Sequence, residues 1–123
     1  PKAVSLDKAG KDLLPKGKTF LIFVLDGTWA CAKRLLNKSR NIRSLPRLSF
    51  SRNYVSQFII KKQPRAHCVS TIEAIYYLCE EAVEAGYENL HSQNEVLMAL
   101  LKKLVAIQLQ YKNGKGRKRE DNV

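Results

Sequence analysis

The sequence predicts a single α/β domain in which a largely parallel sheet is flanked by helices. A chain of 123 residues suits one domain. Residues 20–25 form an unbroken apolar run, which is typical of a strand buried on both faces. After this run, and again after residue 70, apolar side chains recur at helical spacing. Strands that alternate with helices favour a three-layer arrangement with parallel strands.

The first strand is expected over residues 19–25, and a helix is expected over residues 28–38. Asp26 and Gly27 form the turn between them. Thr28 is a suitable N-cap because its hydroxyl can accept a hydrogen bond from a backbone N–H of the first turn. Asp26 stands at the carboxyl end of the strand, and this is the sheet edge at which ligands bind in open α/β folds.

The rest of the first half is expected to be less regular. Residues 1–18 indicate a short helix or an irregular lead-in, and residues 41–46 a basic loop. Short strands are expected over residues 47–50, 53–60 and 67–69, where β-branched and aromatic side chains are frequent.

The clearest helix is expected to begin after Ser70. Ser70 and Glu73 have the spacing of a capping box, in which each residue bonds to the other's backbone. Gly86 suits the left-handed residue that follows a helix end. The acidic residues of this helix, Glu81 among them, are expected on its outer side. Its apolar stripe comprises Ile72, Ile75, Tyr76, Cys79, Ala82 and Val83.

A last helix is expected over residues 91–111, with Ser92 as its N-cap. Residues 113–123 are rich in glycine and charge and indicate a basic, disordered tail. We therefore expect the folded domain to span residues 1–112.

The net charge of +11 is unevenly distributed. Residues 27–72 contain no Asp or Glu, which predicts a surface that attracts a polyanion, most simply nucleic acid. A merely solvated basic surface is the alternative. The ten basic residues of this stretch are Lys33, Arg34, Lys38, Arg40, Arg43, Arg47, Arg52, Lys61, Lys62 and Arg65.

The cysteines argue against a disulfide framework and a cysteine-rich metal site. Cys31, Cys68 and Cys79 are odd in number and widely spaced, so we expect reduced thiols and a cytoplasmic or nuclear location. No metal-ligand spacing is present, and no metal is expected. No apolar run approaches the roughly 20 residues needed to span a membrane.

Three short motifs follow one another in a characteristic order. They are Asp-Gly-Thr-Trp at residues 26–29, Ile-Lys-Lys-Gln-Pro at residues 60–64 and Ser-Thr-Ile-Glu-Ala at residues 70–74. This ordered set resembles the DTW-domain family and extends over residues 20–108. The resemblance implies a SPOUT-like fold with a trefoil knot. It also implies transfer of the 3-amino-3-carboxypropyl group of S-adenosylmethionine to N3 of a uridine in tRNA.

The resemblance also assigns roles to particular residues. Asp26 would hold the methionine amine or accept the N3 proton, whereas its local alternative is to shape the turn. Trp29 would contact the transferred chain, the sulfonium or the target base, or would simply pack in the core. The catalytic set is Asp26, Thr28 and Trp29; the cofactor set is Leu25, Asp26, Gly27, Trp29, Ser70, Thr71 and Glu73; the RNA-binding set is Arg40, Arg43, Arg47, Arg52, Lys61, Lys62 and Arg65.

Other functions remain open from the sequence. An aminocarboxypropyl- or methyltransferase that acts on rRNA is one alternative, and a basic RNA-binding domain without catalysis is another. Many family members contain a cysteine-rich segment before this core, so we expect that the chain lacks an N-terminal portion. The sequence does not distinguish a monomer from a homodimer.

Overall fold

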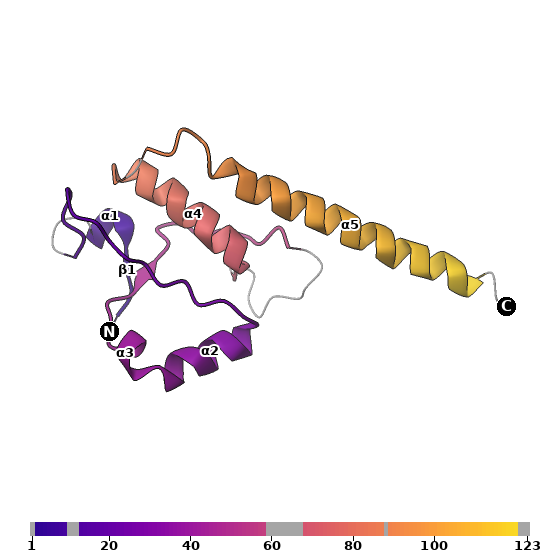
Figure 1. Ribbon diagram of the computed structural model, residues 1–123, viewed down its shortest axis with the longest axis horizontal. Helices are drawn as coiled ribbons and strands as arrows, with labels where there is room; N and C mark the ends of the chain where they lie inside the picture. Colours follow the sequence, from indigo (N-terminus) through magenta and orange to yellow (C-terminus); the bar gives the residue numbers. More distant parts are fainter. Residues whose placement is uncertain (1, 10–12, 59–67, 88, 121–123) are drawn as a thin grey trace.

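The structure is a computed structural model that describes residues 2–9, 13–58, 68–87 and 89–120, without the side chains of residues 9 and 115–120. The elements in chain order are β1 (Val4–Ser5), α1 (Leu6–Ala9), α2 (Trp29–Lys38), α3 (Arg40–Arg43), β2 (Leu48–Ser49), α4 (Thr71–Glu84) and α5 (Glu95–Glu120) (Figure 1).

The core lies between α4 and α5, which run side by side while the second half of α5 projects beyond the rest of the molecule (Figure 1). Three buried side chains of α5, Met98, Leu101 and Val105, form its centre. Ile72 and Tyr76 of α4 pack against them, together with Phe58 and Leu109. Burying each such side chain contributes roughly 1.5–3 kcal/mol, so this contact stabilises the fold.

The described part of the chain has one small sheet. β1 and β2 pair in parallel, with Val4 opposite Leu48 and Ser5 opposite Ser49. The mixed α/β character and the parallel pairing are therefore confirmed, and β2 lies within one of the predicted strands. The larger flanked sheet, the SPOUT-like arrangement and the knot stay predictions.

The prediction of a strand buried on both faces at residues 19–25 is wrong. Residues 20–25 form neither helix nor strand, and no backbone hydrogen bond joins them to another described segment. Leu21 is 81% exposed and Phe23 is 55% exposed. The reason is physical: an apolar run has a tendency toward burial, but it does not specify which chain segment will cover it. Of the other predicted strands, residues 53–58 and 68–69 form none, whereas residues 59–67 lie outside the described ranges.

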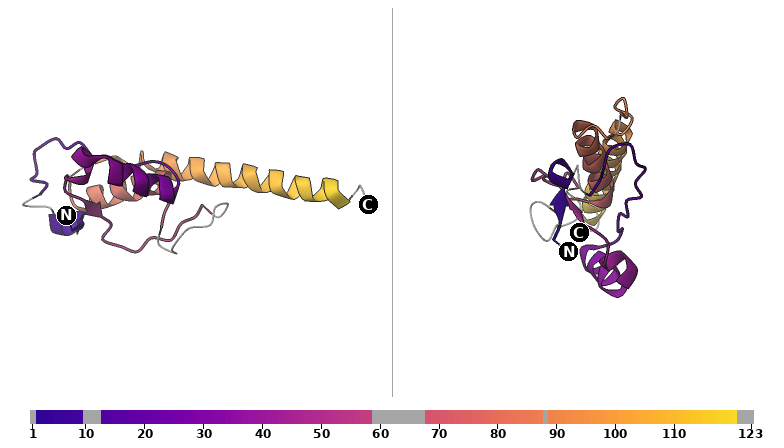
Figure 2. Two further views of the ribbon diagram at one scale, coloured as in Figure 1. Left: turned by 90° about the horizontal axis from the view of Figure 1, so that it is seen from below. Right: turned by 90° about the vertical axis from the view of Figure 1, so that its left-hand side faces the viewer.

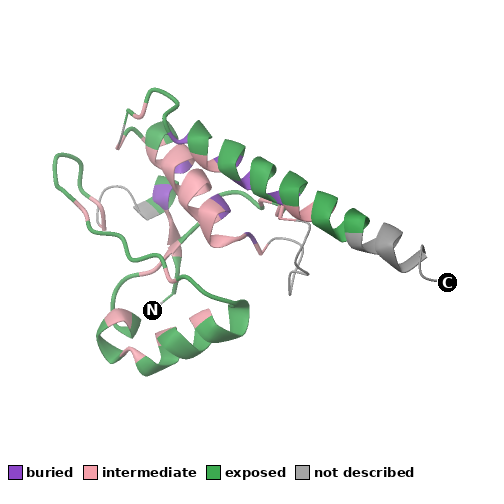
Figure 3. Cartoon of the chain, turned by 45° about the vertical axis from the view of Figure 1, so that its right-hand side comes forward, coloured by how far each residue is buried: buried purple, intermediate pink, exposed green. Residues whose placement is uncertain are grey.

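α2 confirms the predicted helix after the turn. The backbone N–H of Cys31 donates to Thr28 Oγ1 at 3.3 Å, so Thr28 is the N-cap that the sequence predicts. No residue of α2 is buried, and the helix lies apart from the α4–α5 pair (Figures 2 and 3).

α4 also begins and ends as predicted. Its capping box is present at Ser70, and Gly86 has a φ of +78° just beyond the helix. The N–H groups of Gly86 and Tyr87 donate to Val83 and Ala82, which closes the helix with a left-handed turn. The expected outer position of Glu81 is wrong, because that side chain is only 4% exposed. Segment 51–58 covers it and supplies its hydrogen-bond donors.

The start of α5 differs from the prediction. α5 begins at Glu95, so Asn94 rather than Ser92 stands at its N-cap position. His91 and Ser92, with φ values of 47° and 62°, belong to the turn before the helix. Asn94 is buried and donates through Nδ2 to Glu80 at 2.6 Å, which fixes the preceding turn to α4. The sequence predicts a tail from residue 113, whereas α5 continues to Glu120. None of the described helices combines the length and the apolar character that crossing a membrane requires.

Candidate functional site

The first and third sequence motifs meet in the structure. The hydroxyl of Thr71 donates to Asp26 Oδ1 at 2.8 Å, although the two residues are 45 positions apart. Thr71 is the first residue of α4, and Asp26 stands two residues before the N-cap of α2. The amino-terminal ends of two helices therefore converge on one exposed carboxylate (Figure 1). Both ends favour negative charge, because their first N–H groups lack partners within the helix.

Local backbone geometry orients the Asp26 carboxylate. The N–H of Gly27 also donates to Oδ1, at 2.9 Å, whereas Oδ2 makes no hydrogen bond to any described residue. Gly27 has a φ of +143°, and a Cβ placed on it would lie 3.4 Å from Cys31 Cβ. Glycine is required there because other residues rarely adopt this φ. Asp26 thus has one oxygen held by two donors, while the residue as a whole stays exposed.

Trp29 begins α2 directly after the N-cap Thr28. Its side chain is 42% exposed, so core packing does not account for all of its surface. Leu25, on the other side of Asp26, is half-buried and lines a large apolar groove. The structure therefore brings together Leu25, Asp26, Gly27, Thr28, Trp29 and Thr71.

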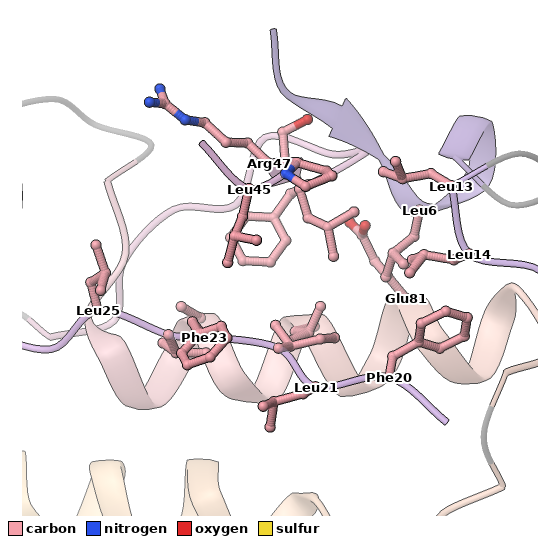
Figure 4. A pocket seen from close by; sticks show the side chains of 18 of the residues that line it. Leu6, Leu13, Leu14, Phe20, Leu21, Phe23, Leu25, Leu45, Arg47 and Glu81 are labelled. Atoms are coloured by element: carbon pink, nitrogen blue, oxygen red, sulfur yellow. The ribbon is translucent and has the colours of Figure 1, made fainter. Parts of the chain in front are cut away.

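The groove measures about 720 Å³ (Figure 4). Residues 20–25 form one wall, residues 45–50 form the other, and Ala74, Leu78 and Glu81 contribute from α4. This volume falls within the range of roughly 300–1,000 Å³ that is typical of small-molecule pockets. Its walls are mostly apolar, which suits a planar ring system better than a charged group.

Ser70 and Glu73 lie beside the junction but are directed inward. Glu73 has no exposed surface. Its Oε2 accepts hydrogen bonds from the N–H and the hydroxyl of Ser70, both at 2.7 Å, and from the hydroxyl of Ser56 at 2.9 Å. The N–H of Gln57 donates to its Oε1. Because this carboxylate is enclosed and fully hydrogen-bonded, it holds neighbouring segments in place rather than facing a ligand.

The basic residues are distributed around this junction. α2 and α3 contain no acidic residue, and the side chains of Lys33, Arg34, Lys38, Arg40 and Arg43 are exposed. Arg47 is half-buried at the groove. Arg52 forms an ion pair with Glu84 at 2.7 Å. The predicted RNA contacts Lys61, Lys62 and Arg65 lie outside the described residues.

Sequence reasoning missed the role of Glu81. Its carboxylate accepts hydrogen bonds from the N–H of Ser51 and the hydroxyl of Tyr54. Burial and the hydrogen bond to Glu81 raise the pKa of Tyr54 to about 12. Tyr54 also stacks on Tyr77 at a centroid distance of 3.8 Å. A signal was present, because Glu73, Tyr77 and Glu81 recur every fourth residue and share one face of α4.

Among the described residues, no group of three or more His, Cys, Asp or Glu side chains is placed to hold a metal ion.

Comparisons with known proteins agree with the motif pattern. A family model described as the DTW domain matches residues 1–109. Two similar proteins, from Macaca fascicularis and Mus musculus, are named tRNA-uridine aminocarboxypropyltransferase 2. Each is 30% identical over 90 residues, which cover 73% of this chain and 28% of the relative. The chain thus spans less than a third of the length of these curated relatives. No solved structure matches it.

The family model covers most of the chain, and two of the motifs that define the resemblance meet at the Asp26–Thr71 hydrogen bond. The chain belongs to the DTW-domain family.

Proposed function

We propose that this chain provides the reactive site of a tRNA-uridine aminocarboxypropyltransferase. The reaction moves the 3-amino-3-carboxypropyl group of S-adenosylmethionine to N3 of a uridine in tRNA. The single observation that supports this most is the hydrogen bond from Thr71 to Asp26, which joins two family motifs at one exposed carboxylate. The names of the two relatives supply the reaction class.

The junction has groups that fit both ends of S-adenosylmethionine. Oδ2 of the exposed residue Asp26 is a suitable acceptor for the methionine ammonium group. The first turn of α4, which begins at Thr71, offers backbone N–H groups to the methionine carboxylate. The apolar groove beside Leu25 is large enough for the adenosine ring system. Together these features would hold the substrate with its reactive carbon near Asp26.

The reaction itself requires little covalent assistance. Uridine N3 attacks the methionine Cγ, the Cγ–S bond breaks, and its electron pair returns to the sulfonium sulfur, which leaves as the neutral thioether methylthioadenosine. The N3 proton must pass to a base, and Asp26 is the exposed carboxylate at the junction. Much of the rate enhancement would come from aligning the two reactants. Asp26 either binds the ammonium group or takes the proton. The pH dependence of transfer by Asp26 variants distinguishes these two roles.

A basic surface leads away from this junction. α2 begins three residues after Asp26, and α2 and α3 together expose five cationic side chains with no acidic residue between them. Such a surface neutralises RNA phosphates and speeds the encounter with RNA. We propose that it docks the tRNA backbone, with Arg40 and Arg43 among its contacts.

An isotope experiment tests the reaction type. The protein is incubated with unmodified tRNA and S-adenosylmethionine that carries label either in the carboxyl carbon or in the methyl group. Aminocarboxypropyl transfer predicts carboxyl label in the RNA and no methyl label. Methyl label alone would show a methyltransferase instead. Neither label, with tRNA still bound, would favour a binding domain without catalysis, which the net charge of +11 makes the second candidate. Repeating the assay with rRNA tests the substrate class.

A further inference from the structure

Segment 51–58 has neither helix nor strand, yet it is fastened to α4 at both ends. At its start, the N–H of Ser51 donates to both carboxylate oxygens of Glu81, at 3.0 and 3.1 Å. The hydroxyl of Tyr54 donates to Glu81 Oε1 at 3.1 Å. Among the described residues, Arg52 and Glu84 form the only ion pair near this end, and both side chains are exposed. Glu81 is therefore the first of two anchors.

The second anchor is Glu73. It accepts hydrogen bonds from the hydroxyl of Ser56 and the N–H of Gln57, while the N–H of Phe58 donates to Ser56 Oγ at 3.1 Å. Phe58 packs against the buried cluster of α5. A buried carboxylate is costly unless it is hydrogen-bonded, so these contacts satisfy the carboxylate and fix the segment at the same time.

Between these anchors, half-buried and exposed side chains alternate along the segment. Tyr54, Ser56 and Phe58 are half-buried against α4 and α5, whereas the side chains of Val55 and Gln57 are exposed. Val55 is 68% exposed, and Asn53 continues the same outward row. Alternation with a period of two is the geometry of an extended segment that presents one row of side chains. We call Asn53, Val55 and Gln57 the outward row.

We propose that the outward row is a recognition surface for unpaired nucleotides of the RNA substrate, an inference that rests on the proposed function. Neither the Asn53 nor the Gln57 amide has a hydrogen-bond partner among the described residues. Each amide offers a donor and an acceptor, the combination that reads the edge of a base. Val55 between them provides an apolar contact for the face of a base. The row also lies within residues 27–72, the stretch without acidic residues.

Unpaired RNA is favoured over duplex RNA by the chemistry of the row. Amide groups are uncharged, so they add little to phosphate binding and act mainly through base edges. In duplex RNA the deep, narrow major groove hides those edges, whereas loops and bulges present them. The two buried anchors hold the row in place before RNA arrives, which lowers the ordering cost of binding.

The test uses Asn53→Ala and Gln57→Ala, with Gln93→Ala as the matched control. Gln93 is an exposed glutamine in the turn before α5, at the opposite end of α4 from Glu73. We expect each row variant to raise the Kd and KM for unmodified tRNA roughly 5- to 100-fold. The melting temperature and the salt dependence of RNA binding should stay unchanged in both row variants, because no phosphate contact is lost. The KM for S-adenosylmethionine should stay unchanged in Gln57→Ala, whereas Asn53 also lines the groove. The control should behave as the unaltered protein does.

Two RNA probes of the same sequence, one single-stranded and one paired to its complement, separate base contacts from phosphate contacts. Loss of preference for the single strand in the row variants would support the proposal, even if no label reached the RNA in the transfer assay. Unchanged Kd and KM in both variants would overturn it while leaving the proposed transfer reaction intact. An equal loss of affinity for both probes, with a shallower salt dependence, would also overturn it.

Discussion

The Thr71 hydroxyl donates to the Asp26 carboxylate at 2.8 Å and so joins the start of α4 to the turn before α2. Asp26 precedes an exposed basic helix, and Thr71 begins the helix that forms the core with α5. The contact therefore connects the turn before a helix that has no buried residue with a helix that packs in the core. Asp26 Oδ2 accepts no hydrogen bond from any described residue, and this is the basis of the proposed reaction.

Removing the Thr71 donor should lower transfer activity without removing the fold. Thr71→Val keeps the side-chain shape but loses the hydroxyl, whereas Thr71→Ser keeps the donor. A hydrogen bond to a charged group is worth about 1.5–3 kcal/mol, so kcat/KM should fall roughly 10- to 100-fold in the valine variant. The serine variant should stay within about threefold of the unaltered protein. Equal loss in both variants would show that the hydroxyl is not the relevant group.

Gly27 should resist substitution for a backbone reason. Gly27→Ala would place a Cβ 3.4 Å from Cys31 Cβ at a φ of +143°. We expect its free energy of unfolding to fall by about 1–3 kcal/mol. Gly114→Ala should instead raise the free energy of unfolding by up to about 1 kcal/mol. Gly114 is helical, and a Cβ there meets open space. Urea unfolding measures both, and a neutral Gly27→Ala would contradict the assigned turn geometry.

The core contact between α4 and α5 makes a second stability prediction. Leu101 is 2% exposed, whereas its neighbour Leu100 is 55% exposed on the same helix. Leu101→Ala should lower the free energy of unfolding by about 2–5 kcal/mol through lost burial and a residual cavity. Leu100→Ala should stay within about 0.5 kcal/mol. Similar losses at both positions would show that α5 buries a different face.

The Tyr54–Glu81 hydrogen bond predicts a stability loss at high pH. The pKa of Tyr54 is raised to about 12 in the folded protein, from the ordinary value of 10.0, by burial and by its bond to Glu81. Between these values the unfolded chain releases a proton that the folded protein retains, so this contribution to stability falls as pH rises. Tyr54→Phe should show a smaller decrease in unfolding free energy between pH 10 and pH 12 than the unaltered protein. Parallel decreases would contradict the assignment.

Local patterns predicted the helices well and the long-range arrangement poorly. The N-cap at Thr28, the capping box at Ser70 and the left-handed Gly86 were all predicted, because each depends on residues within one or two turns. The exposure of residues 21–24 was not, since the sequence of a strand does not specify its neighbours. Ser92 had the right residue type for a cap, but the turn around Asn94 moved the helix start.

In the candidate site, too, local features could be predicted from the sequence and long-range contacts could not. The turn at Asp26 and Gly27 could be placed from the sequence, whereas the position of Thr71 beside it rests on the family resemblance and on contacts across 45 residues. Glu73 was grouped with the cofactor residues because motif membership does not reveal burial. Its complete enclosure instead supports a proposal that it positions Ser56 and Ser70.

The most direct test of the account compares the unaltered protein with Asp26→Asn in transfer of carboxyl label from S-adenosylmethionine to unmodified tRNA. Asparagine retains an oxygen for the Thr71 and Gly27 donors, so the fold should persist while the negative charge is lost. We predict that label transfer falls at least about 100-fold, with unchanged melting temperature and tRNA affinity. Undiminished transfer by Asp26→Asn, or label reaching the RNA only from the methyl group, would contradict the account.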